Sequence, residues 1–389
     1  MTRKLASRPT VLIGLATAFS LLGDQMLYSV LPTYFTSVGL VPYQVGVILS
    51  ANRFIRLITN HLAEQLCRRV RLGALTVLAF GVGALVTYAY AVVTHFGLLV
   101  VARLTWGLCW SFIRQIGLMT VVESNPDHRL GRSMGFYSGI SRTGSLAGNL
   151  LGAVGHDLLG YTTTLIGFSC VSLLAIPLGL FGREGLKHRT AAEPDCEGDV
   201  VRSGGLLFCG FAVGCVGSGL VMSTLGLVLK QMVGEDVGLL GMTIGVASLN
   251  GLFLSARWIA DFFGAPVLGH VGDRLGRKRA TTMLFAIGTV ARSISATVDA
   301  LTAIALAILL FFLCAVGLTT ILLAEAGRRG SRATARYVTA SDFGAALGPA
   351  LGWTSQQFVS STDVIFLMGA SFYGLAAIIS RFPNRPVTR

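Results

Sequence analysis

Long apolar stretches separated by short polar connections make up almost the whole chain, and this alternation predicts its architecture. A helix needs about 20 apolar residues to cross the hydrocarbon core of a bilayer. The pattern predicts an all-α polytopic membrane protein with twelve transmembrane helices. The predicted spans lie at residues 10–35, 43–64, 72–94, 97–121, 134–156, 162–182, 204–230, 239–266, 280–298, 301–324, 337–358 and 363–380.

A single extended polar segment, residues 183–202, interrupts this pattern near the middle of the chain. Six of the predicted spans precede this segment and six follow it. We therefore expect an N-terminal six-helix bundle at 1–182, a cytoplasmic linker at 183–202 and a C-terminal six-helix bundle at 203–389.

The Lys and Arg residues between the predicted spans fall almost entirely on one side of the membrane. One set of connections, together with both termini, carries 23 of them, whereas the opposite connections hold only Lys230. Short basic loops stay on the cytoplasmic side of a membrane. We therefore expect a multi-pass protein of the cell (cytoplasmic or inner) membrane with both termini in the cytoplasm.

Composition excludes a soluble domain. The chain is 53% hydrophobic and 13% charged with a mean hydropathy of +0.70, whereas soluble domains are about 25% charged. Its net charge of +13 sits in short clusters between apolar segments, so we interpret it as a topology signal and expect no nucleic-acid partner. Membrane lipid is the expected surrounding.

An internal repeat appears when the chain is shifted by 200 residues. Glycines spaced by four lie along one helix face and let another helix approach closely. The two halves should therefore be pseudo-symmetric bundles. The matched positions are Arg129, Arg132, Tyr137, Gly144, Gly148 and Gly152 in the first half and Arg329, Arg332, Tyr337, Gly344, Gly348 and Gly352 in the second.

Residues 269–278, GHVGDRLGRK, contain Gly269, Asp273, Arg274, Gly276 and Arg277. This segment resembles the loop signature of the major facilitator superfamily. In that family the signature usually follows the second span, where this chain keeps the acid as Glu64 but lacks the glycines. The better copy lies in the second half, so we expect the stronger cytoplasmic latch there. The resemblance implies two six-helix bundles that work by alternating access.

Further resemblances extend over both halves. Leu99, Arg103 and Gly107 in the fourth span are similar to a motif of proton-coupled exporters, and residues 344–352 in the eleventh span resemble an exporter element normally found in the fifth. The family also implies acid–base pairs that tie spans to neighbouring loops. The implied cytoplasmic gate comprises Glu64, Glu123, Arg129, Gly269, Asp273, Arg274, Gly276, Arg277, Glu325 and Arg332.

Asp24 lies within the first predicted span, one helical turn from Tyr28. A carboxylate in an opening and closing cavity can exchange protons, because burial and nearby arginines change its proton affinity in opposite directions. Asp24 is therefore the leading proton-coupling candidate, acting with Arg103 or Arg114. The alternative is a fixed structural ion pair with one of these arginines.

Seven basic residues fall inside predicted spans, against the acids Asp24, Asp261 and Asp342. Because a charge at mid-bilayer is costly unless it faces protein or water, these residues should line an interior. Arg257 and Asp261 can pair along one helix, and Arg292 near a span end can snorkel. The candidate substrate cavity comprises Tyr28, Arg53, Arg56, Trp110, Arg142, Arg257, Asp261 and Asp342.

Family packing implies that Arg53 or Arg56 approaches Asp342 and that Arg142 approaches Asp261. Such pairs could break and reform as the halves rock, or they could be fixed structural pairs. Both interpretations are open at this point.

The function expected from these observations is proton-coupled secondary-active transport, in the export direction, of a small organic solute that is anionic or zwitterionic. One alternative is an organic-anion importer or exchanger of the same fold, and another is a transporter-like scaffold or sensor. No catalytic constellation or metal-ligand spacing appears in the sequence, so we expect no enzyme, no metal and no cofactor. The expected partners are the solute and protons, and the expected state is a monomer.

Overall fold

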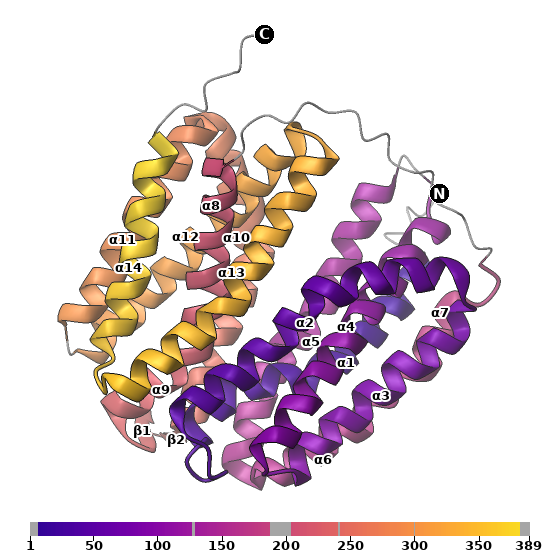
Figure 1. Cartoon of the computed structure of the whole chain (residues 1–389), viewed down its shortest axis with the longest axis horizontal. Coiled ribbons are helices and arrows are strands. Elements are labelled where there is room, and N and C mark those ends of the chain that lie inside the picture. Colours follow the sequence, from indigo (N-terminus) through magenta and orange to yellow (C-terminus); the bar gives the residue numbers. More distant parts are fainter. Residues whose placement is uncertain (1–6, 127–128, 187–203, 240–241, 299, 382–389) are drawn as a thin grey trace. The chain divides into compact units, whose positions relative to one another are not determined.

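The computed structural model describes residues 7–126, 129–186, 204–239, 242–298 and 300–381. Within these residues the chain forms twelve helical stretches, which confirms the predicted fold class (Figure 1). The helical stretches are α1 (Arg8–Tyr34), α2 (Pro42–Arg69), α3 (Leu72–Val92), α4 (Phe96–Ser124), α5 (Leu130–Leu159), α6 (Tyr161–Ser172) continued by α7 (Ala175–Arg183), α8 (Gly204–Ala212) continued by the π-helix η2 (Val213–Val221) and α9 (Met222–Val233), α10 (Val246–Leu275), α11 (Arg277–Thr297), α12 (Leu301–Arg328), α13 (Ser331–Phe358) and α14 (Asp363–Arg381).

Eight of these stretches are long and apolar enough to span a bilayer by composition alone. The other four, α2, α5, α11 and α13, are more polar because they carry charged residues or many small polar ones. Their polarity agrees with helices that turn one face toward protein and another toward lipid.

The eighth span begins later than predicted. An antiparallel hairpin of β1 (Asp236–Leu239) and β2 (Met242–Gly245) precedes it, with Val237 opposite Ile244. A short apolar run does not by itself distinguish a strand from a helix, which explains the error. Helix α10 then starts at Val246, where the Asp157 carboxylate on α5 accepts a hydrogen bond from the Ser248 backbone N–H at 2.9 Å. This contact satisfies one of the donors that a helix start leaves open.

The chain divides into two compact units. Unit 1 comprises residues 1–40, 54–192 and 235–255, and unit 2 comprises residues 41–53, 193–234 and 256–389. The first part of α2 thus belongs to unit 2 and the first part of α10 to unit 1. Most of the predicted linker at 183–202 lies outside the described residues, so the bundle boundaries at 182 and 203 stay predictions.

Unit 1 is held together where α5 packs against α1. A Cβ atom added at Gly144 would collide with the Ala18 backbone, and one at Gly148 would lie 2.7 Å from the Leu22 carbonyl oxygen. Helices this close exclude any larger residue at these positions. The predicted close approach of a glycine face is therefore present in the first half.

Unit 2 repeats this contact at the positions shifted by 200 residues. A Cβ atom at Gly344 would collide with the Phe211 carbonyl, and one at Gly348 with the Cys215 carbonyl. The partner here is the α8–η2 segment, which occupies the place that the regular helix α1 has in unit 1. Helices α11 and α14 lie side by side in the same unit (Figure 1).

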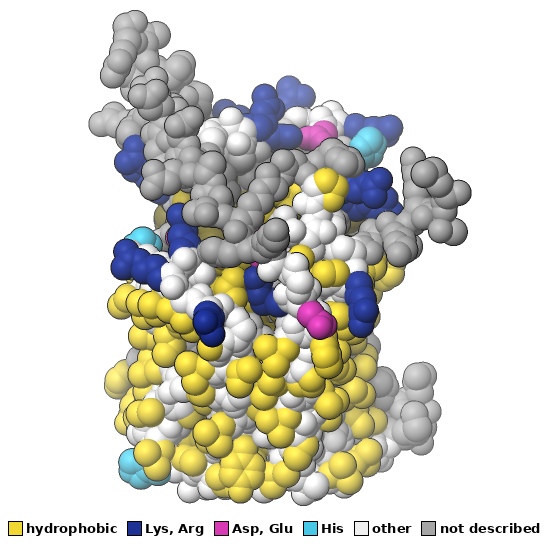
Figure 2. Space-filling model, turned by 90° about the vertical axis from the view of Figure 1, so that its right-hand side faces the viewer, with side chains coloured by type: hydrophobic (Ala, Val, Ile, Leu, Met, Phe, Trp, Pro, Cys, Tyr) yellow, Lys and Arg dark blue, Asp and Glu magenta, His cyan; other side chains and the backbone are white. Residues whose placement is uncertain are grey.

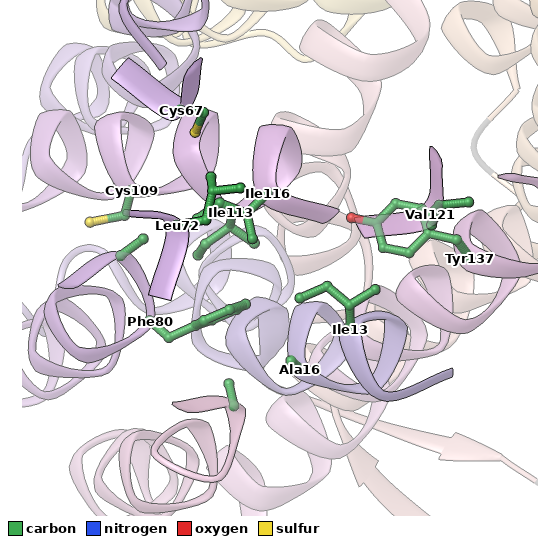
Figure 3. Packing of buried hydrophobic residues seen from close by; sticks show 12 residues of the cluster. Ile13, Ala16, Cys67, Leu72, Phe80, Cys109, Ile113, Ile116, Val121 and Tyr137 are labelled. Atoms are coloured by element: carbon green, nitrogen blue, oxygen red, sulfur yellow. The ribbon is translucent and has the colours of Figure 1, made fainter. Parts of the chain in front are cut away.

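Apolar side chains fill the interior of unit 1 and also cover much of its outside. Figure 3 shows part of the buried cluster, in which Ile13 of α1, Phe80 of α3 and Ile116 of α4 lie close together and are fully buried. On the face shown in Figure 2, hydrophobic side chains cover the lower part while Lys and Arg gather toward the upper end. An apolar surface bounded by a basic rim is typical of a protein embedded in lipid.

Candidate functional site

A buried ion pair joins α1 to α4. The Arg103 Nη1 atom lies 2.5 Å from Asp24 Oδ1, and the two side chains are 0% and 6% exposed. Of the two arginines that the sequence offered as partners of Asp24, Arg103 is the one that pairs with it. Arg114, on the same helix, forms no ion pair with Asp24 in the part of the chain that the structure describes.

Two tyrosines flank the Arg103 guanidinium. Arg103 Nη2 donates to the Tyr28 hydroxyl and Nη1 to the Tyr90 hydroxyl, each at 3.5 Å. The guanidinium carbon also lies 5.7 Å from both ring centroids, within the range of cation–π attraction. Tyr90 in turn donates to the Ala102 carbonyl at 3.4 Å. The two rings therefore cover the guanidinium, and its Nη1 atom still reaches the Asp24 carboxylate.

A chain of amide groups approaches the other carboxylate oxygen. Gln25 Nε2 donates to Asp24 Oδ2 at 3.0 Å, and Asn149 Nδ2 on α5 donates to Gln25 Oε1 at 3.4 Å. Nearby, Asn250 on α10 donates to the Ser29 carbonyl at 2.7 Å. We call Asp24, Gln25, Tyr28, Tyr90 and Arg103 the polar cluster.

The sequence alone did not assign Tyr90, Gln25, Asn149 or Asn250 to this site. For Asn149 a signal was present, because it stands where the repeat has Pro349 in the second half. Asparagine in the first half and proline in the second mark a matched position at which the two halves differ. The other three carried no comparable signal in a single sequence.

Unit 2 buries an arginine of a different kind. Arg292 on α11 is 2% exposed, so it does not snorkel to the surface as its place near a span end suggested. Its guanidinium carbon lies 4.5 Å from the Phe366 ring centroid and 5.5 Å from that of Phe311. Among the described residues its Nε has no hydrogen-bond partner, and no ion pair includes it.

The two buried arginines should respond oppositely to removal of their charge. Arg103→Met leaves the buried Asp24 carboxylate without its cation, and breaking a buried ion pair in this way lowers the free energy of unfolding by roughly 3–5 kcal/mol. Arg292→Met removes a desolvated cation whose Nε lacks a partner, so we expect unchanged or higher stability. Thermal unfolding of the purified variants in the same detergent checks this. Equal destabilisation by both substitutions would contradict the difference in pairing.

The remaining predicted cavity residues lie on α2, α4, α5, α10 and α13. Trp110 packs against the apolar core of unit 1 and so contributes to packing. In unit 2, Arg53 donates to the Ala345 carbonyl at 3.3 Å, and Arg257 donates to Ser218 Oγ of η2 at 3.0 Å and contacts Met222. Arg56, Asp261 and Asp342 are partly buried and Arg142 is exposed.

Arg142 belongs to unit 1 and Asp261 to unit 2. Their predicted pairing therefore stays a prediction, as does the approach of Arg53 or Arg56 to Asp342.

The predicted gate residues of the first half form one buried and one exposed pair. Glu123 accepts from Arg183 Nη2 at 2.7 Å, with the two side chains 2% and 8% exposed, and Arg183 Nη1 donates to Thr120 at 2.7 Å. Glu64 pairs with Arg68 one turn away at 2.8 Å on the surface. Arg183 was not among the predicted gate residues, and Arg129 lies at the start of α5.

In the second half the gate residues pair locally. Glu325 pairs with Arg329 at 3.0 Å and lies 3.8 Å from Arg277, whereas Arg277 pairs with Asp273 at 3.1 Å. Arg332, which the family resemblance implied as a base of this gate, takes part in no ion pair of the described residues.

Glycines complete the second-half loop. Gly276 begins α11 with a φ of 83°, which favours glycine, and Gly269 faces Thr320 of α12. Arg274 is exposed. The sequence favoured a stronger set of contacts in the second half, yet the Glu123–Arg183 pair of the first half is more buried than either Glu325 pair.

The family model described as Major Facilitator Superfamily matches residues 13–322. The chain belongs to this superfamily. It is thus a multi-pass membrane transporter and not an enzyme. No curated protein sequence matches it significantly.

Solved structures of transporters share the fold over nearly the whole chain. The nucleoside transporter NupG aligns with a TM-score of 0.76 at 11% identity, covering 98% of this chain and 100% of that one. A bacterial homologue of the human lysosomal transporter Spinster, in an inward-facing and unoccupied conformation, gives 0.74 at 13%, covering 98% and 100%. A POT family transporter in complex with a thioalcohol-conjugated peptide gives 0.72 at 12%, covering 96% and 94%. At these identities the likeness carries the fold alone.

Proposed function

We propose that this transporter is driven by protons and exports a small organic solute, which carries a negative charge or both charges, across the cell membrane with both termini in the cytoplasm. The observation that supports this most directly is the buried Asp24–Arg103 pair. It places one titratable acid beside one permanent cation within a membrane-spanning bundle. A buried charge of this kind in a membrane protein usually belongs to a substrate or proton pathway.

The pair supports an exchange mechanism for a zwitterion. A cationic group of the solute and a proton compete for the Asp24 carboxylate, while Arg103 holds the anionic group of the solute. Protonation of Asp24 therefore favours release of the solute. Proton entry and solute exit are then coupled because each excludes the other from one carboxylate.

A second candidate is import or exchange of an organic anion. Arg292 supports it, because its buried guanidinium has no acid paired with it in the described residues. An anion that binds Arg103 would displace Asp24 from the guanidinium, and a proton bound by the released carboxylate would then replace the lost ion pair. Anion and proton would in that case move in the same direction.

The direction of proton movement distinguishes these two mechanisms. The assay uses proteoliposomes with trapped pyranine, a dye that reports the luminal pH. External zwitterionic amino acids are expected to change this pH only in vesicles that contain the protein. Under exchange, solute entry drives protons out and raises the luminal pH. Under anion–proton symport, external mono- and dicarboxylates lower it.

A thermal-shift screen of the purified transporter selects the solutes for this assay, since a bound ligand raises the unfolding temperature by mass action. The panel should contain zwitterionic amino acids, mono- and dicarboxylates, nucleosides and the lipophilic cation tetraphenylphosphonium. Stabilisation by tetraphenylphosphonium alone would contradict the proposed substrate class. Solute flux that leaves the pyranine signal unchanged would contradict proton coupling.

A further inference from the structure

A pocket of about 270 Å³ opens in unit 2, where the first turns of α8 and α11 meet the ends of α12 and α14. Its charged lining consists of Arg277, Lys278, Arg329 and Glu325. Leu206 and Leu322, both 5% exposed, contribute to its apolar floor. Three cations and one acid leave the lining with two positive charges in excess.

Each arginine of this pocket has one guanidinium nitrogen that forms no hydrogen bond with the described residues. Arg329 directs Nε and Nη2 to Glu325 Oε1 at 3.1 and 3.0 Å, and Arg277 directs the same two atoms to Asp273 Oδ1 at 3.2 and 3.1 Å. The Nη1 atoms of both are buried and have no hydrogen-bond partner in the described residues. Arg277 Nη1 lies 3.8 Å from Glu325 Oε2, which is too far for a hydrogen bond.

The start of α11 adds to the positive potential. Its first residue is Arg277, and the preceding Gly276 supplies no side-chain cap. The open backbone N–H groups and the helix dipole at such a start favour an anion. Lys278 is exposed and takes part in no ion pair among the described residues. Its ammonium group is thus available to a ligand.

A buried arginine of unit 1 has its guanidinium satisfied within the protein. Arg183, at the end of α7, donates Nη1 to Thr120 and Nη2 to Glu123. Both terminal nitrogens of Arg183 therefore have partners within the protein, whereas the Nη1 atoms of Arg277 and Arg329 have none among the described residues.

We propose that the pocket of Arg277, Lys278 and Arg329 binds the phosphate group of an anionic phospholipid. A phosphate offers several acceptor oxygens to the two Nη1 groups and to Lys278, and its charge offsets the excess of the lining. The apolar floor suits the adjoining glycerol and acyl carbons. Inorganic phosphate shares the headgroup chemistry but makes no use of the floor. This site does not depend on the identity of the transported solute.

The test titrates the purified transporter in detergent with three soluble probes: dihexanoyl phosphatidic acid, dihexanoyl phosphatidylcholine and inorganic phosphate. Thermal unfolding reports binding, and sodium chloride at matched ionic strength controls for screening. Lys278→Gln removes one cation from the lining. Arg279→Gln makes the same charge change at the next residue, which lies outside the lining.

We expect phosphatidic acid to stabilise the wild type at lower concentration than phosphatidylcholine, and Lys278→Gln to need about fivefold more of it. Arg279→Gln should titrate like the wild type. Stabilisation by phosphatidic acid without an effect of inorganic phosphate assigns the site to lipid, and an effect of both assigns it to the phosphate group alone; either supports the proposal. Equal stabilisation by both lipids, or an unchanged titration of Lys278→Gln, would overturn it.

Discussion

Asp24→Asn is expected to abolish proton-driven solute movement, because it removes the one acid that pairs with Arg103 in the polar cluster. Asparagine matches aspartate in shape but neither binds nor releases a proton near neutral pH. Proton-driven accumulation in proteoliposomes should therefore fall to the background of empty vesicles. Counterflow of labelled solute, which needs no gradient, should persist when the protein folds.

Stability separates coupling from packing in this experiment. Asp24→Asn alone leaves the buried Arg103 guanidinium without its acid, so we expect the free energy of unfolding to fall by about 3–5 kcal/mol. Combining Asp24→Asn with Arg103→Met removes both charges and should restore most of it, without restoring proton coupling. Asp363→Asn, at the exposed start of α14, is the matched control and should behave like the wild type. Proton-driven transport by the Asp24→Asn protein would remove Asp24 from the coupling role.

A single added methyl group should destabilise the protein on a glycine face and stabilise it on the opposite, exposed face of the same helix. Gly144→Ala and Gly344→Ala place a Cβ against the Ala18 backbone and the Phe211 carbonyl. Overpacking against backbone costs about 1–3 kcal/mol, and both variants should unfold at lower temperature. Gly135→Ala lies on the same helix as Gly144 with nothing within 4 Å of the added atom. It should stabilise the protein by up to about 1 kcal/mol through helix propensity.

Thermal unfolding and the yield of monodisperse protein in gel filtration measure these differences. A loss of similar size at Gly144 and Gly344 is expected, since both glycines make the same contact in the repeated halves. If Gly144→Ala were as stable as Gly135→Ala, the close approach of α5 to α1 would be wrong. A loss at Gly344 alone would instead restrict the close contact to unit 2.

The amino-acid sequence by itself determined the spans and the repeat. Lipid imposes a local requirement, a run of about 20 apolar residues for each crossing, and such a requirement can be read directly along the chain. The sequence likewise assigned four glycines to helix contacts, because a spacing of four places each pair on one face of its helix. They are Gly144, Gly148, Gly344 and Gly348. The loop at 269–278 carried enough of the superfamily signature to indicate the family.

Hydropathy misplaced the start of the eighth span, because the run before α10 is short. The residues before Val246 are apolar enough to extend a span, but the backbone of Asp236–Leu239 pairs with that of Met242–Gly245 as antiparallel strands. Nothing in a window of this length separates the two outcomes.

Only the tertiary structure decided which acidic and basic side chains form ion pairs. Asp24 and Arg103 are 79 residues apart, and Arg103 and Arg114 lie on one helix, so spacing could not choose between them. Glu123 pairs with Arg183 at the end of the sixth span, and Arg292 turns inward onto Phe366. Such partners depend on how helices rotate and pack around one another. That rotation is set by many side-chain contacts across the bundle, which no single stretch of sequence contains.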